Sequence, residues 1–507
     1  MLALAVVVLA FLFWRNALLA SRVIDGTRWF VLDDDMMISM RYARNLVEGH
    51  GLVWNPGERV EGYTNFLWTM VMAGVHLLRV PEPTISLAVK GVGFVLLASS
   101  LWLSVRMLRL FAPRSLLATP LLLVCLVTCA DVLHWSVWGF ETSLLTFLEL
   151  VFLVCVFEQR WLPIGFAALS LVPLTRGDGL HIFAADALVA LLLSKSRART
   201  MLWLALALVP ACAHLAFRRS YYGEWLPNTY FLKVYLLDGR YARGATYARN
   251  FLLRYAVPLT LAAGSALAIA RNDRRGIAPF VVVVGTLSYA VTTGGDMFGN
   301  FRFFAHVMPI VFVFATAGIV TVAHGKLGSL VWSVVLFVVS FPLVRPMRTL
   351  VVLDTNGDPH EQLQVAMLLK KNARPDSTIA VIPAGIVPYF TRMKAVDVLG
   401  KNDKYVARLT PFPGSMVGHG KLDPAYSLAT KPDLVISCRS HSFVASLTRD
   451  TRTTDVVASF LASGKFQDEY RSYPIREEFL LARTAVYTHA RSKEVLTRDW
   501  KKVEVSP

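Results

Sequence analysis

The sequence predicts a polytopic α-helical membrane protein with about 11 transmembrane helices and a C-terminal soluble α/β domain. The 507 residues are 55% hydrophobic and only 17% charged, whereas soluble domains average about 25% charged residues. Apolar runs recur through residues 1–344, and short basic clusters separate them. In residues 345–507 no run reaches the length of about 20 apolar residues that a spanning helix needs.

The apolar segments are the predicted membrane helices. By residue number they are 2–20, 64–79, 84–105, 116–131, 142–158, 162–175, 180–194, 200–217, 254–271, 277–293, 303–323 and 327–344. Segment 2–20 is expected to span the membrane rather than to be a cleaved signal peptide, because it lacks a basic leader and a small-residue cleavage site. Segment 64–79 is short, and the alternation of the loops leaves one crossing too many, so we expect it to dip into the membrane or lie at its surface.

The net charge of +17 at first suggests a nucleic-acid-binding protein. The basic residues, however, gather in short loops such as 106–114, 195–199 and 271–275. The positive-inside rule keeps such loops in the cytoplasm, so the charge predicts contact with membrane lipid and no nucleic-acid partner. The intervening loops then face outward, and residues 345–507 follow them.

Residues 345–507 are predicted to form a separate domain outside the membrane. Short runs such as Thr378–Ile382 and Leu434–Ile436 have the composition of strands and are bounded by Pro, Gly and Asp. The chain therefore divides into a membrane domain at 1–344, whose first outer loop is 21–65, and an α/β domain at 345–507.

The first outer loop contains the most unusual residues. Asp33, Asp34 and Asp35 follow an apolar stretch and precede an amphipathic helix from Met36 to about Val47. Charge at a membrane boundary is costly unless it is solvated or used, so it favours a functional role. The alternative is a helix cap, for which one aspartate would suffice.

A resemblance to a known family begins at these aspartates. The stretch DDDMMISMRYARNLVEGHGLVWNPGERVEGYTNFLW is similar to the first outer loop of the terminal arabinofuranosyltransferases, which belong to the GT-C superfamily of polyprenyl-phosphate-sugar-dependent transferases. Further similar segments follow in order, and they are Trp138–Glu141, Thr175–Gly179, Pro227–Lys233, Gly294–Phe298 and, more weakly, Pro383–Gly385 and Asp397–Gly400. The resemblance implies a GT-C-like membrane domain.

In that superfamily an acidic residue of the first outer loop is the proposed catalytic base. Relatives often carry two aspartates where this chain has three, so the resemblance implies Asp34 and Asp35 as candidates and Asp33 as an extra carboxylate. A carboxylate can take the proton of an acceptor hydroxyl, and a neighbouring carboxylate raises its pKa. Nearby negative charge also stabilises an oxocarbenium-like transition state. Which of the three is the base stays open.

The phosphate of a lipid donor requires cations at the bilayer edge. The candidates are Arg41, Arg176, Lys233 and Arg302. Each has an ordinary alternative, which is a solvated helix face for Arg41, an ion pair with Asp178 for Arg176, and snorkelling to the headgroups for Lys233 and Arg302.

Polar and aromatic residues of the outward loops are candidates for binding sugar or acceptor. They are Glu141, Asp178, Asp296, Asn228, Tyr63, Asn65 and Trp54. A tight turn after two glycines is the alternative for Asp296, and a favourable acid at a helix start is the alternative for Glu141.

No metal site and no cofactor are expected. The histidines lack metal-ligand spacing, and neither GxGxxG nor a Walker motif occurs. The three adjacent aspartates could hold a divalent cation, but the resemblance does not require one.

The resulting hypothesis is an inverting glycosyltransferase of a bacterial plasma membrane, with its active site and α/β domain in the periplasm. It would move a sugar, expected to be D-arabinofuranose, from a decaprenyl-phosphate-like donor to a cell-envelope glycan that the α/β domain binds. Two alternatives remain open. One is transfer of another sugar, such as mannose, to a protein or lipopolysaccharide, and the other is a transporter without enzymatic activity, although no internal repeat supports it.

Overall fold

The computed structural model describes residues 1–322 except 114, 237 and 299, residue 328, residues 359–437 except 413–416, and strand segments at 470–473, 485–489 and 505–506. Apart from residue 328, the predicted span at 327–344 lies outside these residues, as does the predicted domain boundary between 344 and 345.

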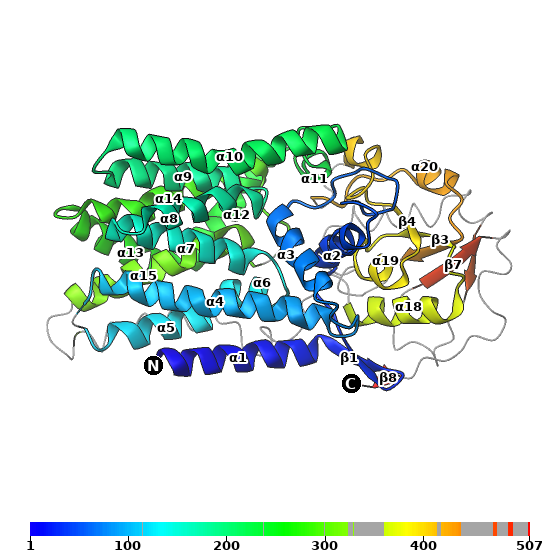
Figure 1. Ribbon diagram of the computed structural model, residues 1–507, viewed down its shortest axis with the longest axis horizontal. Helices are drawn as coiled ribbons and strands as arrows, with labels where there is room; N and C mark the ends of the chain where they lie inside the picture. The colour runs from blue at the N-terminus through cyan, green and yellow to red at the C-terminus, as the bar shows by residue number, and fades with distance from the viewer. Residues whose placement is uncertain are drawn as a thin grey trace.

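A bundle of helices forms one end of the molecule, and a part with mixed helices and strands forms the other (Figure 1). The bundle and its connections comprise α1 (Leu2–Leu19), α2 (Asp34–Val47), α3 (Phe66–Leu77), α4 (Ile85–Arg109), α5 (Ala118–Thr128), α6 (Ala130–Val137), α7 (Thr142–Glu158), α8 (Leu162–Leu171), η1 (Val172–Leu174), α9 (Gly179–Leu193), α10 (Arg197–Tyr222), α11 (Asn228–Lys233), α12 (Arg240–Arg254), α13 (Ala256–Ala270), η2 (Arg274–Ile277), α14 (Ala278–Thr293), η3 (Arg302–Val307) and α15 (Met308–Val322).

Five helices within the described residues are long and apolar enough to cross a membrane. They are α1, α4, α10 and the stretches Arg274–Thr293 and Arg302–Val320. Two bent pairs, α5 with α6 and α12 with α13, raise the number to seven if each pair is one span. A polytopic helical bundle is therefore found as predicted, while the count of about 11 spans stays a prediction.

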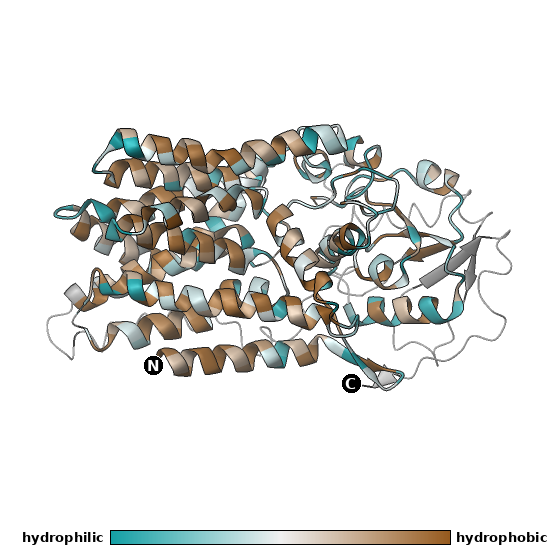
Figure 2. Cartoon of the chain, in the orientation of Figure 1, coloured by the Kyte–Doolittle hydropathy of each residue, from teal (hydrophilic) through white to brown (hydrophobic). Residues whose placement is uncertain are grey.

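The two ends of the bundle differ in polarity. The loops that join α9 to α10 and α13 to α14 lie at the end away from the strands, and they are among the hydrophilic segments of an otherwise hydrophobic bundle (Figures 1 and 2). These are the basic loops from which the sidedness was predicted. The sorting of the loops into two groups thus agrees with the arrangement of the helices.

Two of the stretches between the predicted spans contain helices. Residues 218–250 contain α11 and most of α12, and residues 131–141 contain most of α6. In α12 the buried residues are Gly244, Tyr247, Ala248 and Phe251, at helical spacing, while Arg249 is exposed and Arg240, Arg243 and Arg254 are partly exposed. A search for long apolar runs misses such a helix because its arginines interrupt every apolar stretch.

The other end of the molecule, called the outer part below, contains a five-stranded sheet. Its elements are α18 (Pro359–Asn372), β3 (Thr378–Val381), α19 (Ile386–Thr391), β4 (Lys394–Asp397), η5 (Val406–Arg408), α20 (Pro424–Ala429), β5 (Leu434–Ser437), β6 (Tyr470–Tyr473) and β7 (Ala485–His489). The strand order is β4-β3-β5-β7-β6, parallel from β4 to β5 and antiparallel beyond. The two runs predicted as strands form β3 and β5; β5 is the central strand, β3 lies beside it, and both are buried, as parallel strands usually are.

A small antiparallel sheet begins the first outer loop. It contains β1 (Ser21–Ile24), β2 (Thr27–Phe30) and β8 (Val505–Ser506) in the order β2-β1-β8. The hairpin turn is Asp25-Gly26, and both residues have positive φ, as a tight two-residue hairpin requires.

Candidate active site

The three aspartates lie at the start of α2. Asp33 is the N-cap of this helix, and its carboxylate accepts a hydrogen bond of 3.0 Å from the backbone N–H of Asp35. Asp34 and Asp35 occupy the first turn, where the helix dipole favours negative charge. Burial and the neighbouring Asp35 carboxylate raise the pKa of Asp33 to about 7.

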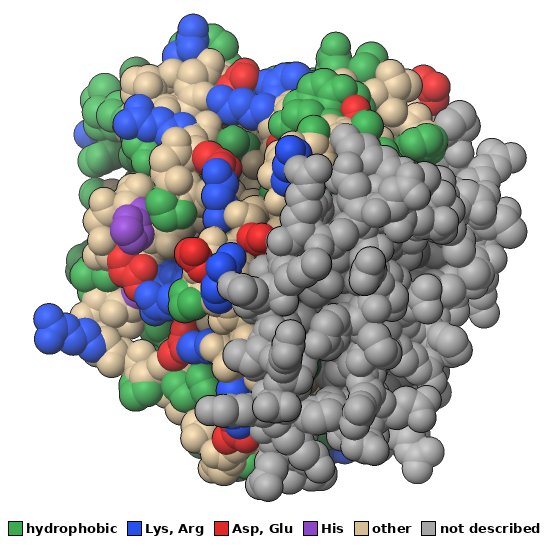
Figure 3. All heavy atoms as spheres, turned by 90° about the vertical axis from the view of Figure 1, so that its right-hand side faces the viewer, with side chains coloured by type: hydrophobic (Ala, Val, Ile, Leu, Met, Phe, Trp, Pro, Cys, Tyr) green, Lys and Arg blue, Asp and Glu red, His purple; other side chains and the backbone are tan. Residues whose placement is uncertain are grey.

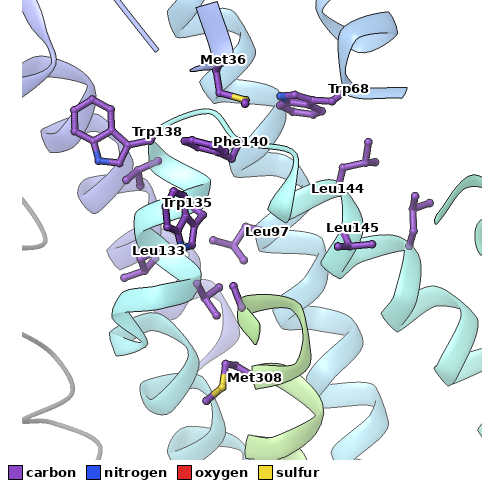
Figure 4. Close-up of a cluster of buried hydrophobic side chains, with 14 of the residues drawn as sticks. Met36, Trp68, Leu97, Leu133, Trp135, Trp138, Phe140, Leu144, Leu145 and Met308 are labelled. Carbon is purple, nitrogen blue, oxygen red and sulfur yellow. The ribbon is translucent and has the colours of Figure 1, made fainter. Parts of the chain in front are cut away.

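An apolar cluster lies next to the first turn of α2 (Figure 4). Met36 of α2 faces Trp68 of α3, and Trp135, Trp138 and Phe140 come from α6 and the loop that follows it (Figure 4). All five side chains are buried. Because Met36 directly follows Asp35 in the chain, the apolar cluster begins one residue from the carboxylates, and apolar surroundings strengthen the interactions between nearby charges.

Asp34 contacts the outer part of the molecule. Its Oδ1 accepts hydrogen bonds from the backbone N–H groups of Gly385 (3.1 Å) and Ile386 (2.8 Å) at the start of α19. A Cβ atom at position 385 would overlap the carbonyl oxygen of Asp34, so only glycine allows this approach. Burial raises the pKa of Asp34 to about 6, although Lys401 and the Ile386 N–H oppose the rise.

Asp35 forms an ion pair with Lys401, which the sequence analysis did not single out. The Lys401 ammonium group donates a short hydrogen bond to Asp35 Oδ1, and the two side chains are 20% (Asp35) and 10% (Lys401) exposed. Burial would raise the pKa of Asp35, but the ammonium groups of Lys401 and Lys233 hold it well below its usual range. Asp35 is therefore ionised and remains partly open to a substrate.

The loop that carries Lys401 is built around a buried carboxylate. Asp397 accepts hydrogen bonds from the backbone N–H groups of Leu399, Gly400 and Asn402 and from the Asn402 side chain, at 2.7–3.1 Å. Gly400 has a φ of +80°. From the bundle side, the amide of Asn228 donates to the carbonyl oxygens of residues 400, 401 and 403 at 2.9–3.0 Å. The position of Lys401 is thus set from both parts of the molecule.

Two further cations of the predicted set lie near Asp35. Both Lys233 and Arg302 lower its pKa through their charge. Arg302 pairs with Asp296, with 2.9 Å between Nε and Oδ2. Its guanidinium also lies 5.2–5.4 Å from the ring centres of Trp135, Phe140 and Phe298, and such contacts hold a cation without neutralising it.

Arg176 and Asp178 form the mutual ion pair that was the alternative for them. The Arg176 guanidinium donates two hydrogen bonds to the Asp178 carboxylate, one of 2.7 Å and one shorter, and a third of 3.1 Å to the backbone oxygen of Arg302. Asn65 donates to Glu141 at 3.2 Å, and the charge of Glu141 acts on both arginines. Arg176 thus holds the backbone of Arg302, and the charge of Glu141 acts on the Arg302 guanidinium.

Three of the predicted site residues, Arg41, Trp54 and Tyr63, have other partners than the cations beside Asp35. Arg41 is buried and donates to the carbonyl oxygens of Trp54 (2.6 Å), Pro388 (2.6 Å) and Met393 (2.8 Å) and to the Asn55 side chain (2.9 Å). The Trp54 indole donates to the Ala384 carbonyl at 3.2 Å, and the Tyr63 hydroxyl lies 3.2 Å from that of Tyr222. Arg41 and Trp54 join the first outer loop to the outer part, and a role in binding substrate stays a prediction for all three.

An Arg41→Met variant is expected to lower the melting temperature by several degrees. The change removes one donor from each of the buried oxygens of Trp54, Pro388 and Met393. Trp54 keeps the Asn45 amide and Pro388 keeps the Arg392 N–H, while Met393 loses its Arg41 donor, at about 1–3 kcal/mol. Fluorescence-detected melting in detergent measures this, with Arg374→Met, at an exposed arginine, as the control. Unchanged melting together with loss of lipid-phosphate binding would instead make Arg41 a phosphate ligand.

Lys401 and His419 are the site residues that the sequence reasoning missed. Lys401 directly follows Asp397–Gly400, a segment with a weak resemblance to the family, and this is the one signal that pointed to it. His419 lies near Lys401, Asp35 and Lys233, and burial lowers its pKa to about 4, so it is neutral. No group of three or more His, Cys, Asp or Glu side chains in the described part of the chain is arranged to hold a metal ion.

The fold of this chain is similar to that of ArnT, a membrane protein with the GT-C fold. It matches the crystal structure of ArnT from Cupriavidus metallidurans in the apo state with a TM-score of 0.56 and 12% identity, over 98% of this chain and 99% of that one. The structure of the same ArnT bound to undecaprenyl phosphate matches with a TM-score of 0.56 and 11% identity over the same shares. At these identities the matches establish the fold alone.

A relative in sequence confirms the resemblance inferred from the first outer loop. The terminal β-(1→2)-arabinofuranosyltransferase of Mycobacterium tuberculosis (strain ATCC 25618 / H37Rv) is 29% identical over 272 residues. The alignment covers 49% of this chain and 42% of that relative, so it spans less than half of either. Residues 354–496 match a family described as a domain of unknown function, DUF8728.

Proposed function

We propose that this chain is an inverting glycosyltransferase that moves D-arabinofuranose from a polyprenyl-phosphate donor to a cell-envelope glycan on the periplasmic face of a bacterial plasma membrane. The observation that carries the proposal is the Asp35–Lys401 ion pair with Lys233 and Arg302 beside it. A carboxylate and several cations in one partly buried site suit a reaction in which one oxygen loses a proton and another gains negative charge.

Asp35 is the proposed base, because the carboxylates of Asp33 and Asp34 already accept backbone hydrogen bonds. Asp33 caps α2, and Asp34 binds the start of α19. As Asp35 takes the proton of the acceptor hydroxyl, the hydroxyl oxygen attacks the anomeric carbon from the face opposite the phosphate. The bond from that carbon to the phosphate oxygen breaks, its electron pair remains on the phosphate, and the configuration inverts.

Lys401, Lys233 and Arg302 are the proposed ligands of the donor phosphate, whose charge rises as it departs. A phosphate that enters competes with Asp35 for the ammonium group of Lys401. Once Lys401 turns to the phosphate, the pKa of Asp35 rises, and a carboxylate with a higher pKa is a better base. The ion pair in the free protein therefore makes donor binding a condition for an effective base.

The identity of the donor rests on the relatives. ArnT has been crystallised with undecaprenyl phosphate, and the mycobacterial relative is named for arabinofuranose. We carry a polyprenyl phosphate and arabinofuranose over to this chain on that basis. The glycan acceptor is likewise carried over from the transferase relative. The periplasmic location rests on the sorting of basic loops to the end of the bundle away from the site.

Incubation of the purified protein with synthetic decaprenyl-phosphoryl-arabinose and an arabinan oligosaccharide tests the proposal. The expected product is one pentose heavier by mass spectrometry, and NMR is expected to show the inverted anomeric configuration. A parallel reaction contains decaprenyl-phosphoryl-mannose, and transfer from that donor alone would favour the alternative sugar. Failure of both reactions, together with passage of the lipid across vesicle membranes, would favour a transporter.

A further inference from the structure

An exposed pair of tyrosines lies on the outer part, away from the reacting groups. Tyr405, which precedes η5, is 46% exposed, and Tyr426 of α20 is 36% exposed. Their ring centres lie 4.3 Å apart with an interplanar angle of 36°. Figure 3 looks at this end of the molecule, and the described atoms there show hydrophobic side chains next to charged ones. Neither tyrosine has a role in the mechanism above.

Both tyrosine rings are held in place at their hydroxyl ends. The Tyr405 hydroxyl donates to Asp423 Oδ2 at 3.0 Å, and the Tyr426 hydroxyl donates to Asp403 Oδ2 at 2.9 Å. Asp423 also caps α20 by accepting from the Tyr426 N–H at 2.9 Å. Since the rings are already ordered while their outer faces remain open, a ligand that stacks on them loses little additional side-chain entropy.

The tyrosine pair is continuous with the active site through one short loop. Lys401, which pairs with Asp35, and Tyr405 are four residues apart, so their Cα atoms lie within about 14 Å of each other. Asp403 lies between them and binds Tyr426 through its side chain, while its carbonyl oxygen accepts from Asn228. A chain of a few sugars has the length to reach from one place to the other.

We propose that Tyr405 and Tyr426 form an acceptor platform, on which a neutral oligosaccharide rests while its terminal sugar lies at Asp35. Open aromatic faces pack against the C–H faces of sugar rings, and the carboxylates of Asp403 and Asp423 at the ring edges accept hydrogen bonds from sugar hydroxyls. The same two carboxylates disfavour an anionic ligand. The platform would select acceptors by length. This inference rests on the proposed function and specifies how the acceptor is recognised.

The test compares acceptors that carry one to four arabinofuranose units as octyl glycosides. A Tyr405→Ala/Tyr426→Ala double variant is expected to raise KM for the tetrasaccharide about tenfold, which corresponds to the loss of one or two aromatic contacts. KM for the single sugar and binding of undecaprenyl phosphate are expected to be unchanged. The Phe variants at both positions keep the rings and are expected to retain most of the affinity.

Tyr241→Ala, at an exposed tyrosine of α12, is the matched control and is expected to behave as the wild type. Equal increases of KM for one and four sugars, or no increase for either, would overturn the platform. Calorimetric binding of the tetrasaccharide without a donor separates the two proposals. If the wild type binds it and the double variant does not, the platform stands even where no sugar is transferred, whereas equal binding by both refutes it.

Discussion

An Asp35→Asn variant is expected to lose transfer activity by about 10²–10⁴-fold in kcat, the contribution of a positioned general base. Asparagine has the same shape as aspartate but cannot accept the acceptor proton at neutral pH. The measurement is the initial rate of transfer with saturating donor, together with the dissociation constant for undecaprenyl phosphate. That constant is expected to stay the same or to fall, because Lys233 and Arg302 remain and Lys401 loses its competing carboxylate.

The neighbouring aspartates provide matched controls for this change. In Asp33→Asn the new side chain still caps α2, because asparagine is a good N-cap residue. In Asp34→Asn the side-chain oxygen can still accept from Gly385 and Ile386. Both variants are expected to retain far more activity than Asp35→Asn. If Asp35→Asn were nearly as active as the wild type while one of the other two was inactive, the base would be that other carboxylate.

A Lys401→Met variant is expected to reduce kcat by about 10²–10³-fold, the usual effect of removing one preorganised donor from a developing negative charge. It is also expected to move the acid limb of the kcat/KM profile to higher pH. Lys401 holds the pKa of Asp35 below its usual range, so Asp35 without this cation becomes protonated at a higher pH. Lys401→Arg restores the charge and is expected to return the limb toward the wild-type position.

Lys404→Met is the control for this second change. Lys404 belongs to the same loop but donates to the backbone oxygen of Tyr222 at 2.8 Å. The substitution removes the same charge without affecting a carboxylate. Similar losses in the two variants, or an unshifted acid limb in Lys401→Met, would assign Lys401 to holding the outer part in place and not to the reaction.

The helix that carries the three aspartates was predictable, because the signals that begin and end it come from neighbouring residues. The sequence predicts a helix from Met36 to about Val47, and the structure has α2 from Asp34 to Val47, followed by Gly49 with a φ of +85°. A capping aspartate, an amphipathic period and a terminating glycine all act within a few residues. The ion pair of Arg176 with Asp178 is equally local and was foreseen as an alternative.

The partners of the carboxylates were not predictable in this way. Asp35 and Lys401 are 366 residues apart, and Arg41 reaches Pro388 over 347 residues. The sequence suggested a solvated helix face for Arg41 as one alternative, and the structure buries it against the outer part. Nothing in the period or composition of either segment specifies which distant surface it will meet.

By itself the sequence predicted a membrane-embedded helical chain that resembles the GT-C transferases, with acidic residues at the head of its first outer loop. Hydrophobic runs, helix caps and basic loops act over short distances, so they can be read from neighbouring residues. Only the tertiary structure decided that Asp35, rather than Asp33 or Asp34, faces a lysine from the outer part. That choice depends on how a distant loop docks on α2, and docking is determined by contacts that exist only once both parts have folded.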